Sequence, residues 1–436
     1  EEAFLADCLA SVAGVVHESI VVDTGSRDRT REIAAAAGAR VIDFPWRDDF
    51  AAARNEGLVR ATGTHVLVLD ADERLAPNMG DSLLAAAAND DLLLGCLPLY
   101  NASSMDATPD EVLSGAKRLG EPAFVPRLFR NLPEMRFDRR VHETLTRGFN
   151  VLQARGVGRS IAVGAALLHL GDVPSYRASR AKDERNERLL RMCLEDDPAD
   201  GEIAGYLVVH LIKTGRAAEA RAVGERHFAP FLARNEARPP GYLPDNMVRI
   251  GYALALAQSD AGDHGRALET VLAAARHTPD GHPNLDYVEG LAHLGLGEHD
   301  AAEACFERAI AAHGKRYAQP VLGGVTDELP RLKLAWIRAA RGDTEAARRG
   351  LPPAQGRWRF ARELVAAEIE LEAGRPEAAM ERLAPFVDVN GLAPDWHALT
   401  HRALAQLGKD ADELLAVARQ SPASAWLEPR RMTLTR

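Results

Sequence analysis

The sequence contains few cysteines, and none of them are paired at a metal-binding or disulfide-framework spacing. Only Cys8, Cys96, Cys193 and Cys305 occur among 436 residues, and the chain has no C-x-x-C motif. Neither a zinc module nor a disulfide framework is therefore suggested. Unpaired thiols persist in reducing compartments, so the sequence favours a cytoplasmic protein.

Long apolar runs and an excess of positive charge are also missing. No run approaches the roughly 20 apolar residues of a membrane-spanning helix, so we expect no integral membrane protein. The net charge of -10 argues against general nucleic-acid binding, although a local basic cleft is compatible with it. The composition, with 46% hydrophobic and 27% charged residues, is that of a soluble globular protein with room for two or three domains.

The first part of the chain alternates short apolar runs with helical patterns. Strands are expected at 19–23, 39–44, 65–69, 92–97, 124–131 and 165–173, and helices at 1–12, 26–38, 48–62 and 81–88. Such alternation indicates βαβ units and an α/β domain with a mostly parallel sheet. The stretch 100–126 interrupts the pattern and is long enough to be a lid or a binding loop.

Three carboxylates follow directly on one of these strands, in the segment HVLVLDADERL. The strand 65–69 has no polar alternation, which is typical of a strand covered on both faces, and Asp70, Asp72 and Glu73 come next. Buried carboxylates are costly unless they are paired or bound to a metal. We therefore expect these acids at the carboxyl edge of the sheet, where α/β proteins bind ligands.

Beyond about residue 176 a tight turn recurs between helical patterns. Its glycine falls at Gly215, Gly262, Gly297, Gly342 and Gly374, and the fifth residue after each is Ala220, Ala267, Ala302, Ala347 or Ala379. The unit 287–310 fits the tetratricopeptide pattern best, with Gly290, Ala302, Phe306 and Ala309 at its small and aromatic positions. These residues predict a tetratricopeptide-like array, with a non-repetitive helical bundle as the alternative.

Residues 19–75 resemble the family 2 glycosyltransferases of the GT-A fold, in the branch that includes the sublancin-type peptide S-glycosyltransferase. The resemblance implies a GT-A domain over 1–175, followed by a tetratricopeptide-like domain over 176–436. It also implies an inverting, metal-dependent enzyme that moves a sugar from a nucleotide-sugar, first of all a UDP-sugar, to a peptide, protein or glycan. Family members begin with a strand that is absent here, and Glu1-Glu2 resemble the end of that segment. Since the sequence also lacks an initiator Met, we expect a truncated record.

The same resemblance assigns the donor side of the site. Asp70-Ala71-Asp72 matches the DxD motif, in which Asp72 would bind Mn²⁺ or Mg²⁺ and Asp70 would face the ribose or a metal-bound water. The remaining donor-binding residues are Asp23, Thr24, Gly25, Arg54 and Asn55. The alternatives are an Asx turn for Asp23 and a solvated helix face for Arg54.

The catalytic residues are expected further along. An inverting transfer needs a base, for which we favour Glu143 in RRVHETL, with Asp138 second. Glu143 could instead form a structural pair with Arg139 or Arg140. His169 matches a further metal ligand, with a core histidine as the alternative. Arg127 and Arg130 either clamp phosphate or line the base of the preceding loop.

The helical half has a repeat pattern but no motif that indicates a catalytic reaction. Stacked helix pairs usually bind protein or peptide segments, and the resemblance implies self-association, so we expect either a homodimer or a captured polypeptide acceptor. The last repeat keeps Leu399, Leu404, Leu407, Leu414 and Leu415 without a polar closing helix. A non-catalytic scaffold with a degenerate GT-A domain is the competing hypothesis for the whole chain.

Overall fold

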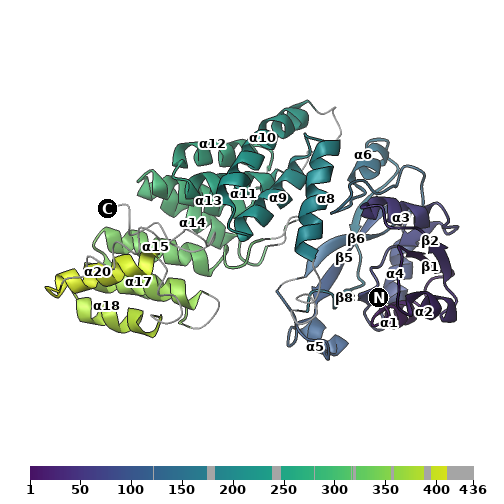
Figure 1. Cartoon of the computed structure of the whole chain (residues 1–436), viewed down its shortest axis with the longest axis horizontal. Coiled ribbons are helices and arrows are strands. Elements are labelled where there is room, and N and C mark those ends of the chain that lie inside the picture. The colour runs from purple at the N-terminus through teal and green to yellow at the C-terminus, as the bar shows by residue number, and fades with distance from the viewer. Residues whose placement is uncertain are drawn as a thin grey trace. The chain divides into compact units, whose positions relative to one another are not determined.

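The computed structural model describes residues 1–120, 122–173, 182–237, 247–278, 280–315, 317, 321–354, 358–386 and 394–409. They form two compact units, Glu1–Ile203 with Arg234–Pro244, and Ala204–Ala233 with Asp245–Arg436. The first unit mixes strands and helices and the second is helical (Figure 1), which confirms the predicted fold class. The boundary predicted between 175 and 176 lies outside the described residues and stays a prediction.

The α/β unit contains the predicted alternation. Its strands are β1 (Ile20–Asp23), β2 (Arg40–Asp43), β3 (His65–Leu67), β4 (Glu73–Leu75), β5 (Leu92–Asn101), β6 (Ala123–Arg130), β7 (Arg159–Ala162) and β8 (Leu167–His169). Its helices are α1 (Leu5–Ser11), α2 (Thr30–Ala36), α3 (Phe50–Leu58), α4 (Gly80–Ala87), α5 (Pro109–Ser114), α6 (Thr146–Ala154) and α8 (Lys182–Asp196). The supposed loop 100–126 thus holds the end of β5, a short helix with a Thr108–Glu111 capping box, and the start of β6.

The sheet is mixed, unlike the mostly parallel sheet that the alternation predicts. β1 and β2 pair in parallel as a two-stranded sheet, and the larger sheet has the order β3-β6-β5-β8-β4 with β7 beside β5. β6 is antiparallel to both β3 and β5, and β4 is antiparallel to β8, whereas β7 and β8 run parallel to β5. The difference arises because β5 and β6 extend into the segment expected to be a loop, so the chain returns antiparallel past α5.

Helices cover both faces of the larger sheet. On β5, Leu97 packs in one apolar cluster with Leu83 of α4, and Leu93 packs in another with Phe149 of α6. Along 65–69, Val66 and Val68 contact the second cluster, whereas Leu67 and Leu69 contact the first. The segment therefore contacts apolar clusters on both faces as predicted, but its residues are only half-buried, and β3 itself ends at Leu67.

The second part of the chain is built from helix pairs, such as α11 beside α12 and α13 beside α14 (Figure 1). The helices are α9 (Gly201–Lys213), α10 (Ala217–Glu236), α11 (Val248–Asp260), α12 (His264–Ala275), α13 (Pro283–Gly295), α14 (His299–Ala311), α15 (Glu328–Ala340), α16 (Thr344–Gly350), α17 (Arg359–Glu372), α18 (Pro376–Leu383) and α20 (Pro394–Gln406), with a 3₁₀ turn, η1 (Ala384–Phe386).

The recurring turn has the predicted geometry. Every one of its five glycines has a positive φ, which residues with a side chain rarely adopt. Each of the alanines five residues further on is fully buried. In the best-fitting unit, a Cβ on Gly290 would lie 2.6 Å from Cε1 of Phe306, so only glycine fits there. These findings confirm the tetratricopeptide-like prediction.

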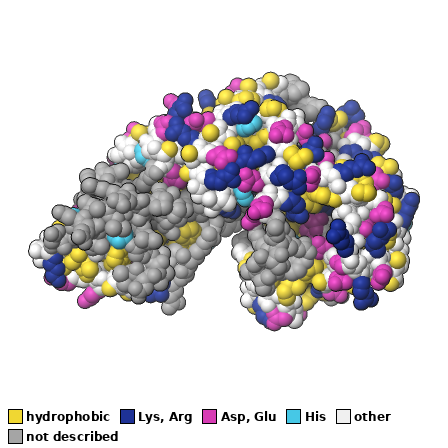
Figure 2. All heavy atoms as spheres, in the orientation of Figure 1, with side chains coloured by type: hydrophobic (Ala, Val, Ile, Leu, Met, Phe, Trp, Pro, Cys, Tyr) yellow, Lys and Arg dark blue, Asp and Glu magenta, His cyan; other side chains and the backbone are white. Residues whose placement is uncertain are grey.

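Charges are mixed on the surface. Figure 2 shows basic and acidic side chains interspersed over the visible face of both units. No described helix is long and apolar enough to cross a membrane. All four cysteines are free thiols, as their spacing predicts. Of the predicted terminal leucines, Leu399 is buried in α20, whereas Leu414 and Leu415 lie outside the described residues.

Candidate active site

The acidic segment forms a tight turn between β3 and β4. The Glu73 N–H donates to the Asp70 carbonyl at 2.9 Å, which closes the turn, and β4 begins at Glu73. Cys8 of α1 packs beneath this turn, with its Sγ 3.5 Å from the Asp70 carbonyl oxygen. Asp70 and Asp72 therefore lie at the end of β3, as the sequence predicts.

Arg54 connects two carboxylates that are far apart in the sequence. Asp49 caps the N-terminus of α3 by accepting from the Ala52 N–H, and Arg54 follows one turn later. Its Nη2 donates to Asp70 Oδ1 at 2.6 Å and its Nε donates to Glu143 Oε1 at 2.6 Å. The predicted DxD turn and the predicted base thus meet on one guanidinium, which excludes the solvated helix face considered for Arg54.

A second arginine holds the other side of Asp70. Arg127 of β6 donates through Nη2 to Asp70 Oδ2 at 2.9 Å and to Glu73 Oε1. Desolvation would raise the pKa of Asp70, but its side chain is still 40% exposed, and the Arg54 and Arg127 guanidiniums hold that pKa well below its usual range. Asp70 is therefore a carboxylate at neutral pH.

Glu73 lies underneath, with 1% of its surface exposed. Burial and the neighbouring Asp70 carboxylate raise the pKa of Glu73, whereas Arg127 opposes that shift. Glu73 also accepts the Asp70 N–H at 3.0 Å. It therefore supports the turn and Arg127 from below and does not face a ligand.

Asp72 and His169 face each other across the β4–β8 pair. Asp72 Oδ2 lies 3.7 Å from His169 Nε2, and the other ring nitrogen, Nδ1, lies 2.7 Å from Asn101 Oδ1 on β5. Burial would lower the pKa of His169, but the Asp72 carboxylate outweighs it and raises that pKa. One ring nitrogen of His169 thus lies beside Asn101 and the other beside Asp72, and metal-binding histidines are commonly oriented by such a second partner.

Gly171 leaves the space that the Asp72 carboxylate occupies. A Cβ at residue 171 would lie 1.9 Å from Asp72 Oδ2 and 2.9 Å from His169 Nε2. Nearby, Asp70, Asp72 and Glu143 supply carboxylate oxygens, of which Asp70 and Glu143 are paired with Arg54 and Asp72 lies beside His169. The oxygen-rich donor set fits Mn²⁺ or Mg²⁺.

Glu143 lies in a closed loop with an unusual backbone. Asp138 and Thr144 exchange two backbone hydrogen bonds, of 2.9 and 3.1 Å, and Arg139 and His142 between them have positive φ values. Asp138, the second candidate base, is half-buried, and burial raises its pKa. The loop therefore fixes the direction in which Glu143 points.

The two arginines of the loop do not pair with Glu143. Arg139 donates to Asp200 at 2.6 and 3.1 Å and to Glu202 at 2.8 Å, and Arg140 donates to Asp196 at 2.6 Å. The structural alternative for Glu143, a pair with Arg139 or Arg140, is therefore contradicted. These contacts anchor the loop on residues that follow α8 or end it.

Replacement of the loop arginines should have unequal effects on stability. Arg139→Ala leaves Asp200, whose side chain is 8% exposed, without its main partner. This should lower the free energy of unfolding by about 2–4 kcal/mol. Arg140→Ala is the matched control, because it removes an ion pair to Asp196, whose side chain is 56% exposed. It should lower the free energy of unfolding by only about 0–1 kcal/mol. Scanning calorimetry of the full chain measures both, and equal shifts in the unfolding temperature would contradict the anchoring role of Arg139.

The remaining predicted donor residues lie at the end of β1 and on α3. Asp23 is buried, its Oδ1 accepts the Ser26 N–H at 3.1 Å, and its Oδ2 has no hydrogen-bond partner, although Arg31 lies 3.8 Å away. Thr24 and Gly25 follow on the surface. The Asx turn thus exists, and it leaves one buried carboxylate oxygen of Asp23 without a hydrogen bond.

Asn55 points elsewhere. Its amide donates to the Phe137 carbonyl at 2.9 Å and accepts the Phe137 N–H at 2.8 Å, which ties α3 to the start of the Glu143 loop. Arg130 likewise binds the backbone carbonyls of Val157 and Asp90, away from Asp70. Of the two arginines considered as phosphate clamps, Arg127 is the one among the carboxylates.

Several contributing residues carry no sequence motif. Glu73 is visible as an acid beside the DxD segment, but its supporting role depends on Arg127. Asn101 is paired with His169 by the register of β5 and β8, and Gly171 lies two residues past the end of β8, so neither contribution could be predicted from sequence spacing.

Comparison with known proteins finds matches to both parts of the chain. A model of glycosyl transferase family 2 matches residues 1–146. A TPR repeat-containing protein of Synechococcus elongatus is 32% identical over 318 residues, which cover 72% of this chain and 73% of that protein. An uncharacterized glycosyltransferase of Rickettsia typhi is 35% identical over 96 residues, 22% of this chain and 32% of that protein. A solved tetratricopeptide repeat protein from Parabacteroides merdae is 15% identical, with a TM-score of 0.37, over 56% of this chain and 94% of that chain.

Proposed function

This chain belongs to the family of the Synechococcus elongatus TPR repeat-containing protein and carries a glycosyl transferase family 2 domain, and from that premise we propose that it is an inverting, metal-dependent glycosyltransferase. The donor is a nucleotide-sugar, and we propose a UDP-sugar. The acceptor is a peptide, protein or glycan, and the resemblance to the sublancin-type branch makes a peptide the first to test. The observation that carries the proposal is Arg54, which binds Asp70 of the DxD turn and the candidate base Glu143 with one guanidinium.

We propose that Asp72 and His169 hold the divalent ion and that Asp70 lies beside the ribose or a metal-bound water. When bound, the ion supplies Lewis-acid stabilisation of the nucleoside diphosphate. Support comes from the 3.7 Å approach of Asp72 to His169 and from the absent side chain at Gly171. Asp23, whose Oδ2 has no hydrogen bond and lies 3.8 Å from Arg31, would accept a hydrogen bond from the base, beside Thr24 and Gly25. Arg54 would complete the donor site, and Asn55 would support it through its hydrogen bonds to the Phe137 backbone.

In the transfer step, Glu143 takes the proton of the acceptor hydroxyl, amide or thiol. The acceptor atom then forms the bond to the anomeric carbon as the bond from that carbon to the diphosphate oxygen breaks, and the diphosphate leaves with the electron pair. Glu143 Oε1 is already held by Arg54 at 2.6 Å, so Oε2 is the oxygen we assign to the proton. Attack from the face opposite the leaving group inverts the configuration.

The experiment is a donor survey with the full chain. UDP-sugars are incubated with Mn²⁺, Mg²⁺ or EDTA, with and without peptide acceptors, and released UDP and glycosylated product are measured. Metal-dependent release of UDP from one donor class is expected. Absence of both UDP binding and release with every donor would favour the non-catalytic scaffold.

Gly171→Ala should weaken metal-dependent UDP binding at least about tenfold, because the new Cβ competes with the Asp72 carboxylate for the same space. Gly164→Ala is the matched control, since a Cβ there meets nothing within 4 Å. Titration calorimetry with UDP and Mn²⁺ compares the two variants. A Gly171→Ala protein with unchanged affinity would show that the Asp72 position does not matter for donor binding.

For the helical repeats we propose a role in self-association or in holding a polypeptide acceptor. The support is the tetratricopeptide-like stacking, which presents extended helical surfaces. Light scattering of the full chain distinguishes a dimer from a monomer, and binding of labelled acceptor peptides tests the other role. A monomer that captures no peptide would leave the repeats without either function.

A further inference from the structure

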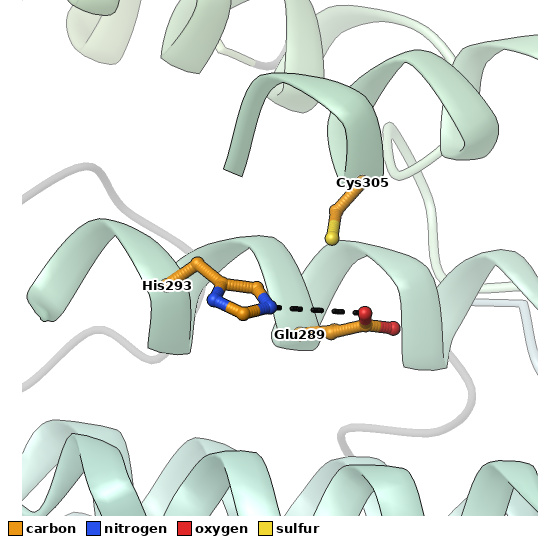
Figure 3. Close-up of side chains that lie close together, drawn as sticks. All are labelled: Glu289, His293 and Cys305. Atoms are coloured by element: carbon orange, nitrogen blue, oxygen red, sulfur yellow. Dashed lines mark ion pairs between the residues drawn. The ribbon is translucent and has the colours of Figure 1, made fainter. Parts of the chain in front are cut away.

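A second group of metal-ligating side chains lies in the helical repeats. Glu289 and His293 stand one turn apart on α13, and Cys305 projects toward them from α14 (Figure 3). One ligand atom from each of the three lies within 4.8 Å of the others, and His293 Nε2 is 3.9 Å from Glu289 Oε1. Zinc ligands at about 2.0–2.3 Å in tetrahedral geometry lie roughly 3.3–3.7 Å apart, so small side-chain movements would bring these three together.

The imidazole is already oriented for a metal. His293 Nδ1 lies 2.6 Å from Glu298 Oε2, in the turn between α13 and α14. A carboxylate that accepts the Nδ1–H fixes the tautomer in which Nε2 carries a lone pair, and metal-binding histidines commonly have such a partner. Figure 3 shows this nitrogen facing Glu289, and the Cys305 sulfur lies within 4.8 Å of it.

A positive group occupies this place in the described structure. Arg308 Nη2 donates to Glu289 Oε2 at 3.0 Å and to Cys305 Sγ at 3.3 Å, and its Nε donates to Asp286 at 2.8 Å. The Arg308 side chain is 48% exposed, so its Nη2 can leave while the Asp286 contact persists. This group of side chains contains three carboxylates, those of Asp286, Glu289 and Glu298, and this one guanidinium. Their combined negative charge exceeds the positive charge of the guanidinium and favours the binding of a cation.

We propose that Glu289, His293 and Cys305 form a binding site for one zinc-type transition metal ion, which clamps α13 to α14. The mixture of thiolate, imidazole and carboxylate selects zinc, and cobalt as its analogue, over the Mg²⁺ or Mn²⁺ of the transferase domain. Cys305 is 2% exposed, and the Glu289 and His293 side chains are 16% and 15% exposed, so the ion enters from the solvent side. On binding, the Cys305 thiol releases its proton to water, and a water molecule completes the four ligands.

Cobalt titration of the full chain, freed of metal with a chelator and dialysed, tests the site. Co²⁺ bound by a thiolate gives a sulfur-to-metal charge-transfer absorption, which carboxylate and imidazole ligands do not give. One equivalent of Co²⁺ should produce this absorption, and Zn²⁺ should displace it. Absence of the absorption in the unmodified chain would overturn the proposal.

Matched variants assign the ligands. Cys305→Ser should abolish the absorption and Cys96→Ser, at a half-buried thiol on β5, should retain it. Glu298→Gln should weaken Co²⁺ binding roughly 10- to 100-fold through the orientation of His293, whereas Glu307→Gln, at an exposed position of α14, should not. Arg308→Ala should tighten binding because the competing guanidinium is gone. An absorption that survives Cys305→Ser, or unchanged affinity in both Glu298→Gln and Arg308→Ala, would contradict the site.

A thermal measurement distinguishes this site from the carboxylates of the transferase domain. Zn²⁺ should raise the unfolding temperature of the helical unit in the unmodified chain and in Asp72→Ala, but not in His293→Ala. Equal stabilisation of His293→Ala would place the zinc effect elsewhere.

Discussion

Glu143→Gln is expected to lower the rate of sugar transfer roughly 100- to 10,000-fold while UDP binding stays near normal. A glutamine cannot accept the acceptor proton, yet it has nearly the shape of glutamate and can still accept a hydrogen bond from Arg54. Arg54 also keeps its contact to Asp70 at 2.6 Å, so the donor side of the site stays in place. A base acts mainly in the transition state, and its loss therefore appears in kcat.

The control for this prediction is Asp138→Asn in the same loop. The ion pairs of Arg54 are with Asp70 and Glu143, whereas Asp138 is held by its backbone bridge to Thr144. Transfer and UDP binding are measured for both variants with a saturating donor. If Glu143→Gln keeps most of its transfer rate while Asp138→Asn loses it, Asp138 is the base.

Asp72→Ala is expected to remove nearly all metal-dependent UDP binding. Because transfer needs the bound donor, we expect the rate of sugar transfer to fall by about two orders of magnitude or more. Without a cation, the carboxylates of the turn repel the diphosphate, and Asp72 is the carboxylate that faces His169 at 3.7 Å. Calorimetry with UDP in Mn²⁺ and in EDTA separates the metal effect from other contacts. Equal UDP binding by the unmodified chain in EDTA would contradict the metal site itself.

Asp43→Ala provides a matched control. Asp43 also ends a strand, β2, but its side chain is 65% exposed and pairs with Arg31 at 3.2 Å on the surface. UDP affinity and its dependence on Mn²⁺ should be unchanged in this variant. A similar loss of UDP affinity in both variants would indicate that the net charge of the α/β unit, and not a metal site at Asp72, controls UDP binding.

The helical half could be predicted from sequence because its rules are local. A glycine in the left-handed region and an alanine five residues later specify each turn and each helix crossing without reference to distant residues. The sheet was less predictable. Whether β6 runs parallel or antiparallel to β5 depends on pairing between strands, and alternation of apolar runs carries no information about direction.

The residues of the candidate site also fall into two groups, those that a local motif identifies and those that depend on contacts between distant segments. Asp70, Asp72 and Glu143 could be proposed from their motifs, since a resemblance preserves spacing within a segment. The contacts of Arg54 and Arg127 to these carboxylates join segments that are distant in sequence, and nothing in either segment specifies which acid its arginine binds. Asn55 illustrates the converse, because its position beside Arg54 suggests a donor contact while its amide binds the Phe137 backbone.

The anchoring of the Glu143 loop has a consequence for dissecting this chain into recombinant pieces. The acids that hold Arg139 and Arg140 are Asp196, Asp200 and Glu202, all of which come after the last strand of the α/β unit. A fragment cut at residue 175 would contain the whole sheet and yet lose every one of these partners. Likewise, a chimera that grafts the repeats of a relative after residue 175 would import foreign residues at positions 196–202. A fragment or chimera that keeps the Glu143 loop anchored should therefore retain this chain's own residues at least through Glu202.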